Sequence, residues 1–438
     1  MNLPAFFNAC KRILERSLLI GICWYAFSGC SFLALQKNVE MYEQHVRLSG
    51  QLWNPSSQNK PIIVLLYQVL NQEKRIVNYR IYHKPDRFQF MVLPGQYIIE
   101  AFEDENQDLT YQETEWATYY GTPSIITIEA DQDQLNLNIT LQPPGDIVLT
   151  EYPNLSSKTT QARLHLPHIR FGKIVKLEDD LFSEDKARLG LWEPLRFVKE
   201  VGGGIYFLDN FDLGKIPVLF IHGAGGTPQS WAPIIQGMDR DTFQPWLFYY
   251  PSGLYLDDAT EFLRQALSQI SLTYTFKKLV IVAHSMGGMI ARAAINLAIQ
   301  KGRGQELPLL FVTISTPWGG HHGAQMAIDY SAIGIIPSWI DLAPESPFQK
   351  KLFEIHFPSN IHHYLLFSYK GRQNPFTKEN DDGAVSLASQ LHPKAQNSAE
   401  KILGFNEDHA SILRSQVMMT ELNKILKSFE RSTIGKQQ

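Results

Sequence analysis

The chain has 438 residues, of which 44% are hydrophobic and 19% are charged, and its formal net charge is −4. This length leaves room for two or three domains, and the composition is that of a globular protein. The balanced charge and the lack of a long basic run exclude the electrostatic surface of a nucleic-acid-binding protein.

The first 30 residues contain all three cysteines, Cys10, Cys23 and Cys30. The body from Ser31 onward therefore has no disulfide, no thiolate nucleophile and no cysteine metal site. An apolar run at residues 17–27 follows a basic segment with Lys11, Arg12 and Arg16. The run has the length of a signal peptide and is short for a transmembrane helix.

The apolar run ends in the sequence Phe27-Ser28-Gly29-Cys30. This resembles the lipobox of bacterial lipoproteins, although Phe27 stands where leucine is usual. The resemblance implies a signal peptide over residues 1–29, a diacylated Cys30 and a tether over residues 30–44. The expected location is the bacterial cell envelope, with the chain anchored to a membrane by lipid. An uncleaved N-terminal anchor helix is the alternative, and both place the body outside the cytoplasm.

Short alternating strands separated by turn residues fill residues 45–141, which predicts a small antiparallel β-sandwich. One hairpin around Pro94-Gly95 resembles transthyretin-like sandwiches. Its acidic turn at residues 104–108 is interpreted as a solvated hairpin tip, with a calcium site as the alternative. We expect the sandwich to be a spacer or to bind a protein or glycan partner. A linker rich in Pro, Ser and Thr follows at residues 142–161.

Short β-branched runs alternate with longer helical segments over residues 162–430. This alternation predicts βαβ units and a mostly parallel sheet, so the overall class is α/β with a preceding all-β domain. Between a buried-type strand and a helix lies the sequence Ala283-His284-Ser285-Met286-Gly287-Gly288. A serine between small residues at such a junction is typical of a nucleophile elbow, which exposes the hydroxyl beside a helix N-terminus.

With this motif, residues 162–428 resemble α/β-hydrolases of the lipase and esterase kind. The resemblance implies a fold with Ser285 as nucleophile. It also implies an oxyanion hole formed by the backbone N–H groups of Ala224, in the loop after His222-Gly223, and of Met286. His222 is expected to support this loop rather than to act as a base.

Two later segments agree with the same family in chain order. Asp382, directly before Gly383, resembles the acid of the triad, with Asp381 as the fallback. His409 resembles the late histidine of the family and is expected to be the general base. Since the order Ser285, Asp382, His409 is that of α/β-hydrolases, the resemblance implies acyl-enzyme chemistry without a metal or organic cofactor.

Adjacent histidines at His321 and His322 could be metal ligands, but no further ligand has suitable spacing, so a loop near the cleft is favoured. The apolar stretch at residues 324–350 is either a lid over an acyl pocket or buried packing. It contains the sequence LAPESPF, which resembles a segment of bacterial lipases and of hydrolases that deacylate lipid anchors.

The expected function is therefore an exported carboxylic ester hydrolase with an ester or lipid substrate, acyl lipids being the first choice. Three alternatives stay open. The same triad could serve an acyltransferase or an amidase or peptidase, or the chain could be a non-catalytic lipoprotein that binds a partner.

Overall fold

The structure, a computed structural model, describes residues 44–432 except 57, 59, 71–72, 83, 122–124, 131, 150–152, 156–168, 303–308, 331–334 and 372–379. The predicted signal peptide, Cys30 and nearly all of the tether lie outside the described residues. Within the described part of the chain, no helix has the length and apolar character needed to cross a membrane.

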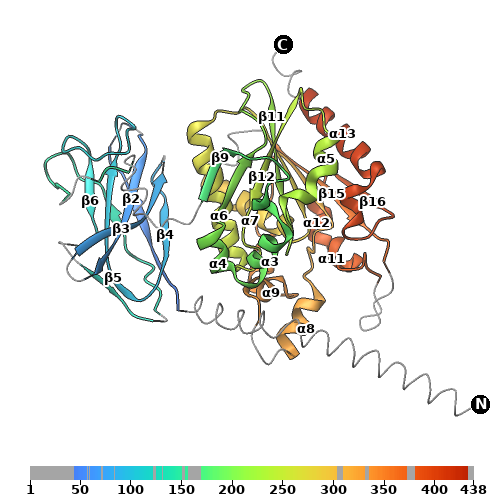
Figure 1. Ribbon diagram of the computed structural model, residues 1–438, viewed down its shortest axis with the longest axis horizontal. Helices are drawn as coiled ribbons and strands as arrows, with labels where there is room; N and C mark the ends of the chain where they lie inside the picture. Colours follow the sequence, from blue (N-terminus) through green and yellow to red (C-terminus); the bar gives the residue numbers. More distant parts are fainter. Residues whose placement is uncertain are drawn as a thin grey trace, which may run out of the picture.

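The N-terminal domain consists of two small sheets that face each other across one apolar core (Figure 1). The first sheet has the order β4-β1-β8, and the second has the order β3-β2-β5-β6 with β7 paired to β5. Most of the pairs are antiparallel, and only β8 runs parallel to its neighbour β1. The bounds of the strands are β1 Val46–Trp53, β2 Ile62–Leu70, β3 Glu73–Tyr82, β4 Arg87–Val92, β5 Gly95–Glu103, β6 Ala117–Tyr119, β7 Ile126–Ile128 and β8 Ile139–Thr140.

The C-terminal domain is built on an eight-stranded sheet with the order β16-β15-β14-β13-β11-β12-β10-β9. Only the pair β10–β12 is antiparallel, and the other neighbours are parallel. The predicted class, a mostly parallel α/β domain after a small β domain, is confirmed. The strands are β9 Ile169–Ile174, β10 Gly203–Phe207, β11 Ile216–Ile221, β12 Phe243–Tyr249, β13 Leu279–His284, β14 Leu309–Ile314, β15 Ile361–Ser368 and β16 Lys401–Phe405.

Helices cover both faces of this sheet (Figure 1). The α-helices are α3 Glu184–Trp192, α4 Pro194–Glu200, α5 Ala232–Gln236, α6 Leu256–Thr273, α7 Met286–Gln300, α8 His322–Tyr330, α9 Pro337–Leu342, α10 Pro347–Lys351, α11 Leu387–Gln390, α12 Pro393–Ser398 and α13 Gln416–Arg431. Short 3-10 turns occur at η1 Asp180–Phe182, η2 Pro228–Trp231 and η3 Ser411–Arg414.

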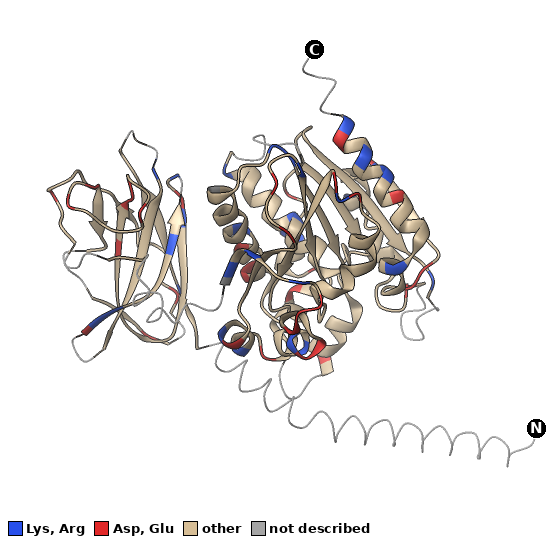
Figure 2. Ribbon diagram, turned by 45° about the horizontal axis from the view of Figure 1, so that its top comes forward, with Lys and Arg blue, Asp and Glu red and all other residues tan. Residues whose placement is uncertain are grey.

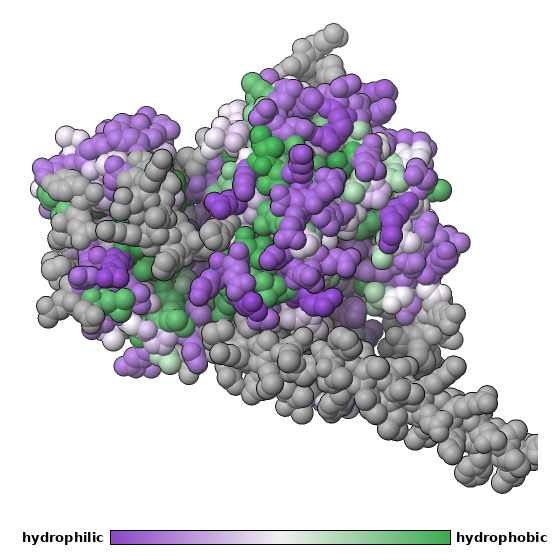
Figure 3. All heavy atoms as spheres, in the orientation of Figure 1, coloured by the Kyte–Doolittle hydropathy of each residue, from purple (hydrophilic) through white to green (hydrophobic). Residues whose placement is uncertain are grey.

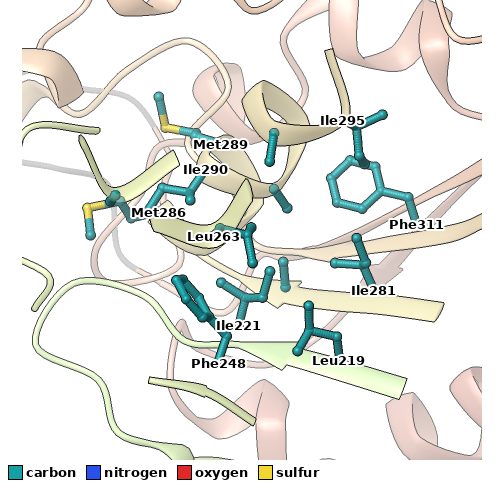
Figure 4. Close-up of a cluster of buried hydrophobic side chains, with 14 of the residues drawn as sticks. Leu219, Ile221, Phe248, Leu263, Ile281, Met286, Met289, Ile290, Ile295 and Phe311 are labelled. Atoms are coloured by element: carbon teal, nitrogen blue, oxygen red, sulfur yellow. The ribbon is translucent and has the colours of Figure 1, made fainter. Parts of the chain in front are cut away.

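The central strands are apolar at most positions because both of their faces are buried. In β11, Leu219 and Ile221 join the core under α6 and α7, whereas Val218 and Phe220 join the core under α5 and α13. Figure 4 shows part of the first of these cores, with Met286 of α7 at its edge. Parallel strands that are buried on both faces have nearly continuous hydrophobic sequences, and the sequence of this chain has such runs. In the ribbon of the C-terminal domain, charged residues lie mainly on the outer helices and loops (Figure 2).

The sandwich contacts the C-terminal domain through Asp86, in the turn between β3 and β4. The Asp86 carboxylate lies 3.4 Å from Arg264 of α6 and 2.5 Å from Lys301, directly after α7. The side chain of Asp86 is only 8% exposed, so this three-way ion pair is largely shielded from solvent. A cavity of about 500 Å³ also lies between the domains, lined in part by Tyr97 and Phe262, and it includes no predicted site residue.

Candidate active site

Ser285 occupies a strained turn between β13 and α7. Its backbone φ of 53° lies in the left-handed region, which a residue other than glycine adopts only when its surroundings force it. The N–H of Ser285 donates to the carbonyl of Ile314 at 2.8 Å, so the adjacent strand β14 fixes the turn. The hydroxyl is thereby presented at the N-terminus of a long buried helix, as the elbow motif predicts.

The two glycines after Ser285 lie in close contact with neighbouring backbone and side-chain atoms. A Cβ atom on Gly287 would lie 2.6 Å from the carbonyl oxygen of His222, and one on Gly288 would lie 2.1 Å from the hydroxyl of Thr316. Ala283, which stands where glycine is usual, is fully buried in the core under α6 and α7. The turn thus accommodates a methyl group before the serine but none on the two glycines after it.

The structure brings Ser285, His409 and Asp382 into one hydrogen-bonded chain. The Nδ1 atom of His409 lies 2.7 Å from Oδ2 of Asp382, and its Nε2 lies 3.0 Å from Oγ of Ser285. An ionised carboxylate only accepts hydrogen bonds, so the ring proton is assigned to Nδ1. Nε2 is then free to accept the proton of the serine hydroxyl. The Asp382 side chain is fully buried, and that of His409 is 19% exposed.

Asp382 is held ionised by the hydrogen bonds around its carboxylate. Its Oδ1 accepts from the N–H groups of Ala384 at 3.1 Å and Val385 at 2.8 Å, and Oδ2 also accepts from Ser368 Oγ at 2.6 Å. Burial acts to raise the pKa of Asp382, but the bonds from His409 and Ser368 outweigh it, and the pKa lies below its ordinary value.

The fallback acid, Asp381, makes a different contact from that of Asp382. Its carboxylate accepts from the N–H of Gly383 at 2.9 Å, a contact within its own turn. Of the two adjacent aspartates, Asp382 is therefore the one that the structure places against His409.

Two contacts fix the loop that carries His409. The N–H of His409 donates to the carbonyl of Asp382 at 2.8 Å, and its carbonyl lies 2.9 Å from Nε2 of His284. Burial lowers the pKa of His284 to about 3, so the ring is neutral and donates this bond from Nε2. Asp408 closes the turn by accepting from the N–H groups of Ala410 and Ser411.

The glycine-rich loop after β11 lies against the nucleophile. A Cβ atom on Gly223 would lie 2.7 Å from Cβ of Ser285, so only glycine permits this approach. The next residue, Ala224, is exposed at the loop surface. The N–H of Gly225 donates to Ser252 Oγ at 2.9 Å and holds the loop from behind. Met286 opens α7, so its N–H has no acceptor in a preceding helical turn.

His222 supports this loop and does not reach into the triad. Its ring stacks on Tyr250 with centroids 4.4 Å apart, and its Nδ1 lies 2.9 Å from the carbonyl of Gly223. Burial lowers the pKa of His222 to about 4, which keeps the ring neutral. The hydroxyl of Tyr250 donates to the carbonyl of His222 at 2.8 Å and ties the loop to β12.

Sequence reasoning did not identify Ser368 or His284 as parts of the site. Ser368 is the last residue of β15, and its position at the end of an apolar strand is the only signal for it in the sequence. His284 appears in the sequence only as a member of the elbow motif. Each contacts the triad through one side-chain hydrogen bond.

The two candidate metal sites have other hydrogen-bond roles. His321 Nδ1 accepts from the N–H of Ala324 at 3.2 Å, and the Asp104 carboxylate accepts from the N–H groups of Asp108 and Leu109. Across the described ranges, no group of three or more His, Cys, Asp or Glu side chains is placed to hold a metal ion.

The stretch proposed as either lid or packing divides into two parts. Leu342 and Phe348, of α9 and α10, are buried in the core under α7. In α8, by contrast, Met326 is 41% exposed and Tyr330 is 82% exposed. Ala324 is the only buried residue of this helix. On the face of the molecule drawn in Figure 3, hydrophobic patches are scattered among hydrophilic side chains. Packing therefore accounts for α9 and α10, and α8 remains at the surface.

Comparison with known protein families gives one match, to the PGAP1-like alpha/beta domain over residues 248–338. This range runs from the end of β12 through the nucleophile turn to α9. A comparison with curated proteins gives no match.

Solved structures with a similar arrangement include three hydrolases. The mature lipase BlEst2 of Bacillus licheniformis is 18% identical with a TM-score of 0.41, covering 51% of this chain and 97% of that chain. Phospholipase PlaB of Legionella pneumophila is 17% identical with a TM-score of 0.33, covering 40% and 45%. The Vlm2 thioesterase domain is 16% identical with a TM-score of 0.33, covering 52% and 97%.

The nucleophile turn, the chain order of the three side chains and the match to the PGAP1-like domain agree with one another. The domain formed by residues 169–431 has the α/β-hydrolase fold.

Proposed function

We propose that this protein is an exported, membrane-anchored serine hydrolase that cleaves carboxylic esters. The single observation that carries the proposal is the continuous chain from Ser285 Oγ through His409 to the buried Asp382 carboxylate. A hydroxyl, a neutral imidazole with its acceptor nitrogen facing that hydroxyl, and an ionised acid behind it are the parts that acyl transfer needs.

In the proposed reaction, Nε2 of His409 takes the proton of Ser285 as Oγ attacks the ester carbonyl carbon. The carbonyl oxygen becomes negative and accepts hydrogen bonds from the N–H groups of Ala224 and Met286. The His409 imidazolium, stabilised by Asp382, then gives its proton to the leaving alcohol, and an acyl-enzyme remains. Water attacks this ester with His409 again as base, which releases the acid and restores the serine.

We propose an acyl lipid as the substrate. The supporting observations are the apolar stretch after β14 and the exposed apolar side chains Met326, Tyr330 and Ile340 on α8 and α9. The lipobox-like end at Cys30 would hold the enzyme at the surface where such lipids occur. This segment lies outside the described residues, so the anchor rests on the sequence alone.

The triad is tested by labelling with a fluorophosphonate, which reacts with activated serines. We expect labelling of the wild type and its loss in Ser285→Ala, whereas no labelling of the folded wild type would refute the catalytic proposal. Hydrolysis of p-nitrophenyl esters of graded chain length tests the substrate. Activity that rises with chain length supports acyl lipids, and activity on acetyl and butyryl esters alone excludes them.

Transfer to a competing alcohol, followed by product analysis, separates a hydrolase from an acyltransferase. Matched amides of the same acyl chain test an amidase in the same assay. The anchor is tested by metabolic labelling with palmitate, which we expect to be lost in Cys30→Ala together with sedimentation in the membrane fraction. Labelling that persists in Cys30→Ala would show that the lipobox interpretation is wrong.

A further inference from the structure

Two buried hydroxyls lie behind the acid of the triad. Ser368 ends β15, and Ser315 directly follows β14, the neighbouring strand; both are fully buried. Ser368 Oγ lies 2.6 Å from Oδ2 of Asp382, and Ser315 Oγ lies 2.6 Å from Ser368 Oγ. The two serines therefore extend the chain of hydrogen bonds beyond Asp382, away from the nucleophile.

The direction of these hydrogen bonds follows from counting protons. The ionised Asp382 carboxylate can only accept, so Ser368 must give it its single hydroxyl proton. Ser368 then has only lone pairs left for its other neighbour, and Ser315 must be the donor to Ser368. All the donors point toward Asp382, and hydrogen bonds in such a chain polarise and strengthen one another.

Hydrogen bonds to the backbone hold both serines in place. The backbone of Ser368 is held on both sides by the buried side chain of Gln390, whose oxygen accepts from its N–H at 3.1 Å and whose nitrogen donates to its carbonyl at 3.1 Å. Ser315 has a φ of 51°, a left-handed conformation that is unfavourable for serine. Its N–H donates to the carbonyl of Leu366 at 2.9 Å, which holds it in that conformation. Strained backbone conformations of this kind cluster at functional sites.

The bond from Ser368 ends on the oxygen that His409 uses. Oδ2 of Asp382 accepts from both Ser368 Oγ and His409 Nδ1, whereas Oδ1 accepts from backbone N–H groups. Ser368 thus determines where this oxygen lies and how much of its charge is available to the imidazole. A hydroxyl that only filled space would have no preference for Oδ2.

We propose that Ser368, supported by Ser315, is a positioning residue of the triad that aligns the Asp382 carboxylate with His409. This rests on the proposed serine hydrolase function. Without the hydroxyl of Ser368, Oδ2 loses one of its two donors, and its charge concentrates on the bond to His409. The imidazolium is then better stabilised, while the carboxylate is less firmly oriented.

The test measures the rate of fluorophosphonate labelling of Ser285 between pH 5 and 9, which requires no knowledge of the natural substrate. For Ser368→Ala we expect a rate at the optimum reduced by about tenfold or more, from the lost bond to a charged group. We also expect the acid limb of the profile to move to higher pH. Ser315→Ala should shift the limb in the same direction by a smaller amount, because Ser368 keeps its own bond to Asp382.

Ser338→Ala is the matched control, since this serine is fully buried and its hydroxyl has no hydrogen-bond partner among the described residues. We expect it to label like the wild type. Thermal unfolding of each variant separates misfolding from misalignment, and Ser368→Cys replaces Ser368→Ala if the latter does not fold. A Ser368 variant that is destabilised but keeps the wild-type rate and acid limb would overturn the proposal. Absence of labelling in the wild type would instead refute the hydrolase function itself.

Discussion

Replacing Asp382 by asparagine should invert the direction of the hydrogen bond between residue 382 and His409, although the two side chains have nearly the same shape. The two carboxylate oxygens of Asp382 have different neighbours. Oδ1 faces two backbone N–H groups that cannot turn away, those of Ala384 and Val385. The amide oxygen of an asparagine must therefore stay at this position, which places its NH2 group where Oδ2 now lies.

The NH2 group would then face Ser368 Oγ and His409 Nδ1, which lie 2.6 and 2.7 Å from Oδ2 in the wild type. A serine hydroxyl can rotate and accept. His409 can accept at Nδ1 only by moving its proton to Nε2, which faces Ser285 Oγ at 3.0 Å. Nε2 can then no longer take the proton of the nucleophile. We expect kcat to fall by about 10⁴-fold, or ~5.4 kcal/mol in the activation barrier.

The assay compares kcat for a p-nitrophenyl ester in wild type, Asp382→Asn and Asp381→Asn. The last is a matched control, because Asp381 differs by one position and, among the described residues, its carboxylate accepts a hydrogen bond from its own turn and not from His409. We expect it to keep a rate close to that of the wild type. Thermal unfolding confirms that each variant is folded. A folded Asp382→Asn protein with kcat within about tenfold of the wild type would refute the tautomer reasoning.

Three further predictions concern packing and stability. Gly287→Ala should abolish esterase activity, because its methyl group would lie 2.6 Å from the carbonyl oxygen of His222, and an active variant would contradict this contact. His222, His284 and His363 have pKa values lowered by burial to between about 3 and 4, below the unfolded value, so protons bind preferentially to the unfolded chain. The free energy of unfolding should thus decrease as pH falls from 6.5 toward 4, by roughly 1.4 kcal/mol per pH unit for each histidine. Partly buried carboxyls with raised pKa values bind protons preferentially in the folded chain, so they offset part of this decrease. A melting temperature that stays constant from pH 7 to 5 would oppose this. Asp86→Asn should remove about 2 kcal/mol from unfolding in denaturant, because Lys301 loses this carboxylate and Arg264 keeps only Glu261 as an acidic partner among the described residues. An unchanged midpoint would show that the domain contact is not stabilising.

The parts of the site that the sequence predicts are those with a local signature. Ser285 lies in a six-residue motif between a strand and a helix, and Asp382 and His409 each precede a recognisable turn. Their convergence follows from a parallel sheet, in which the ends of β13, β15 and β16 meet at one edge. The sheet order could not be read from single strands, because it depends on contacts between segments that are distant in the chain.

The parts that sequence reasoning missed lack such a signature. Ser368 is one polar residue at the end of an apolar run, and its role depends on Asp382, which lies 14 positions later. The strands β9 and β10 and the helices α3 and α4 were not predicted. Glycines at Gly172, Gly203 and Gly204 interrupt the strand pattern, and these have positive φ values that side-chain alternation does not describe.

The contacts of α7 decide which part of the apolar stretch after β14 can move. Arg292 of α7 is buried, and its Nε donates to the carbonyl of Leu352 at 2.7 Å. Its guanidinium lies between the rings of Phe353 and Phe357, with both centroids at 4.3 Å. Burial lowers the pKa of Arg292 to about 9, so it is still charged at neutral pH and these contacts persist.

The nucleophile helix is thus tied to the chain that directly follows α10, and a displacement there would expose a buried cation. The α8 helix is much less buried, with Ala324 as its one buried residue. It follows His321, whose N–H donates to the carbonyl of Leu342 at 2.7 Å, and it continues outward with exposed Met326 and Tyr330. If substrate entry requires a moving element, the physical cost is lowest at α8. The rigid α10 side would then keep Ser285 in place while α8 is displaced.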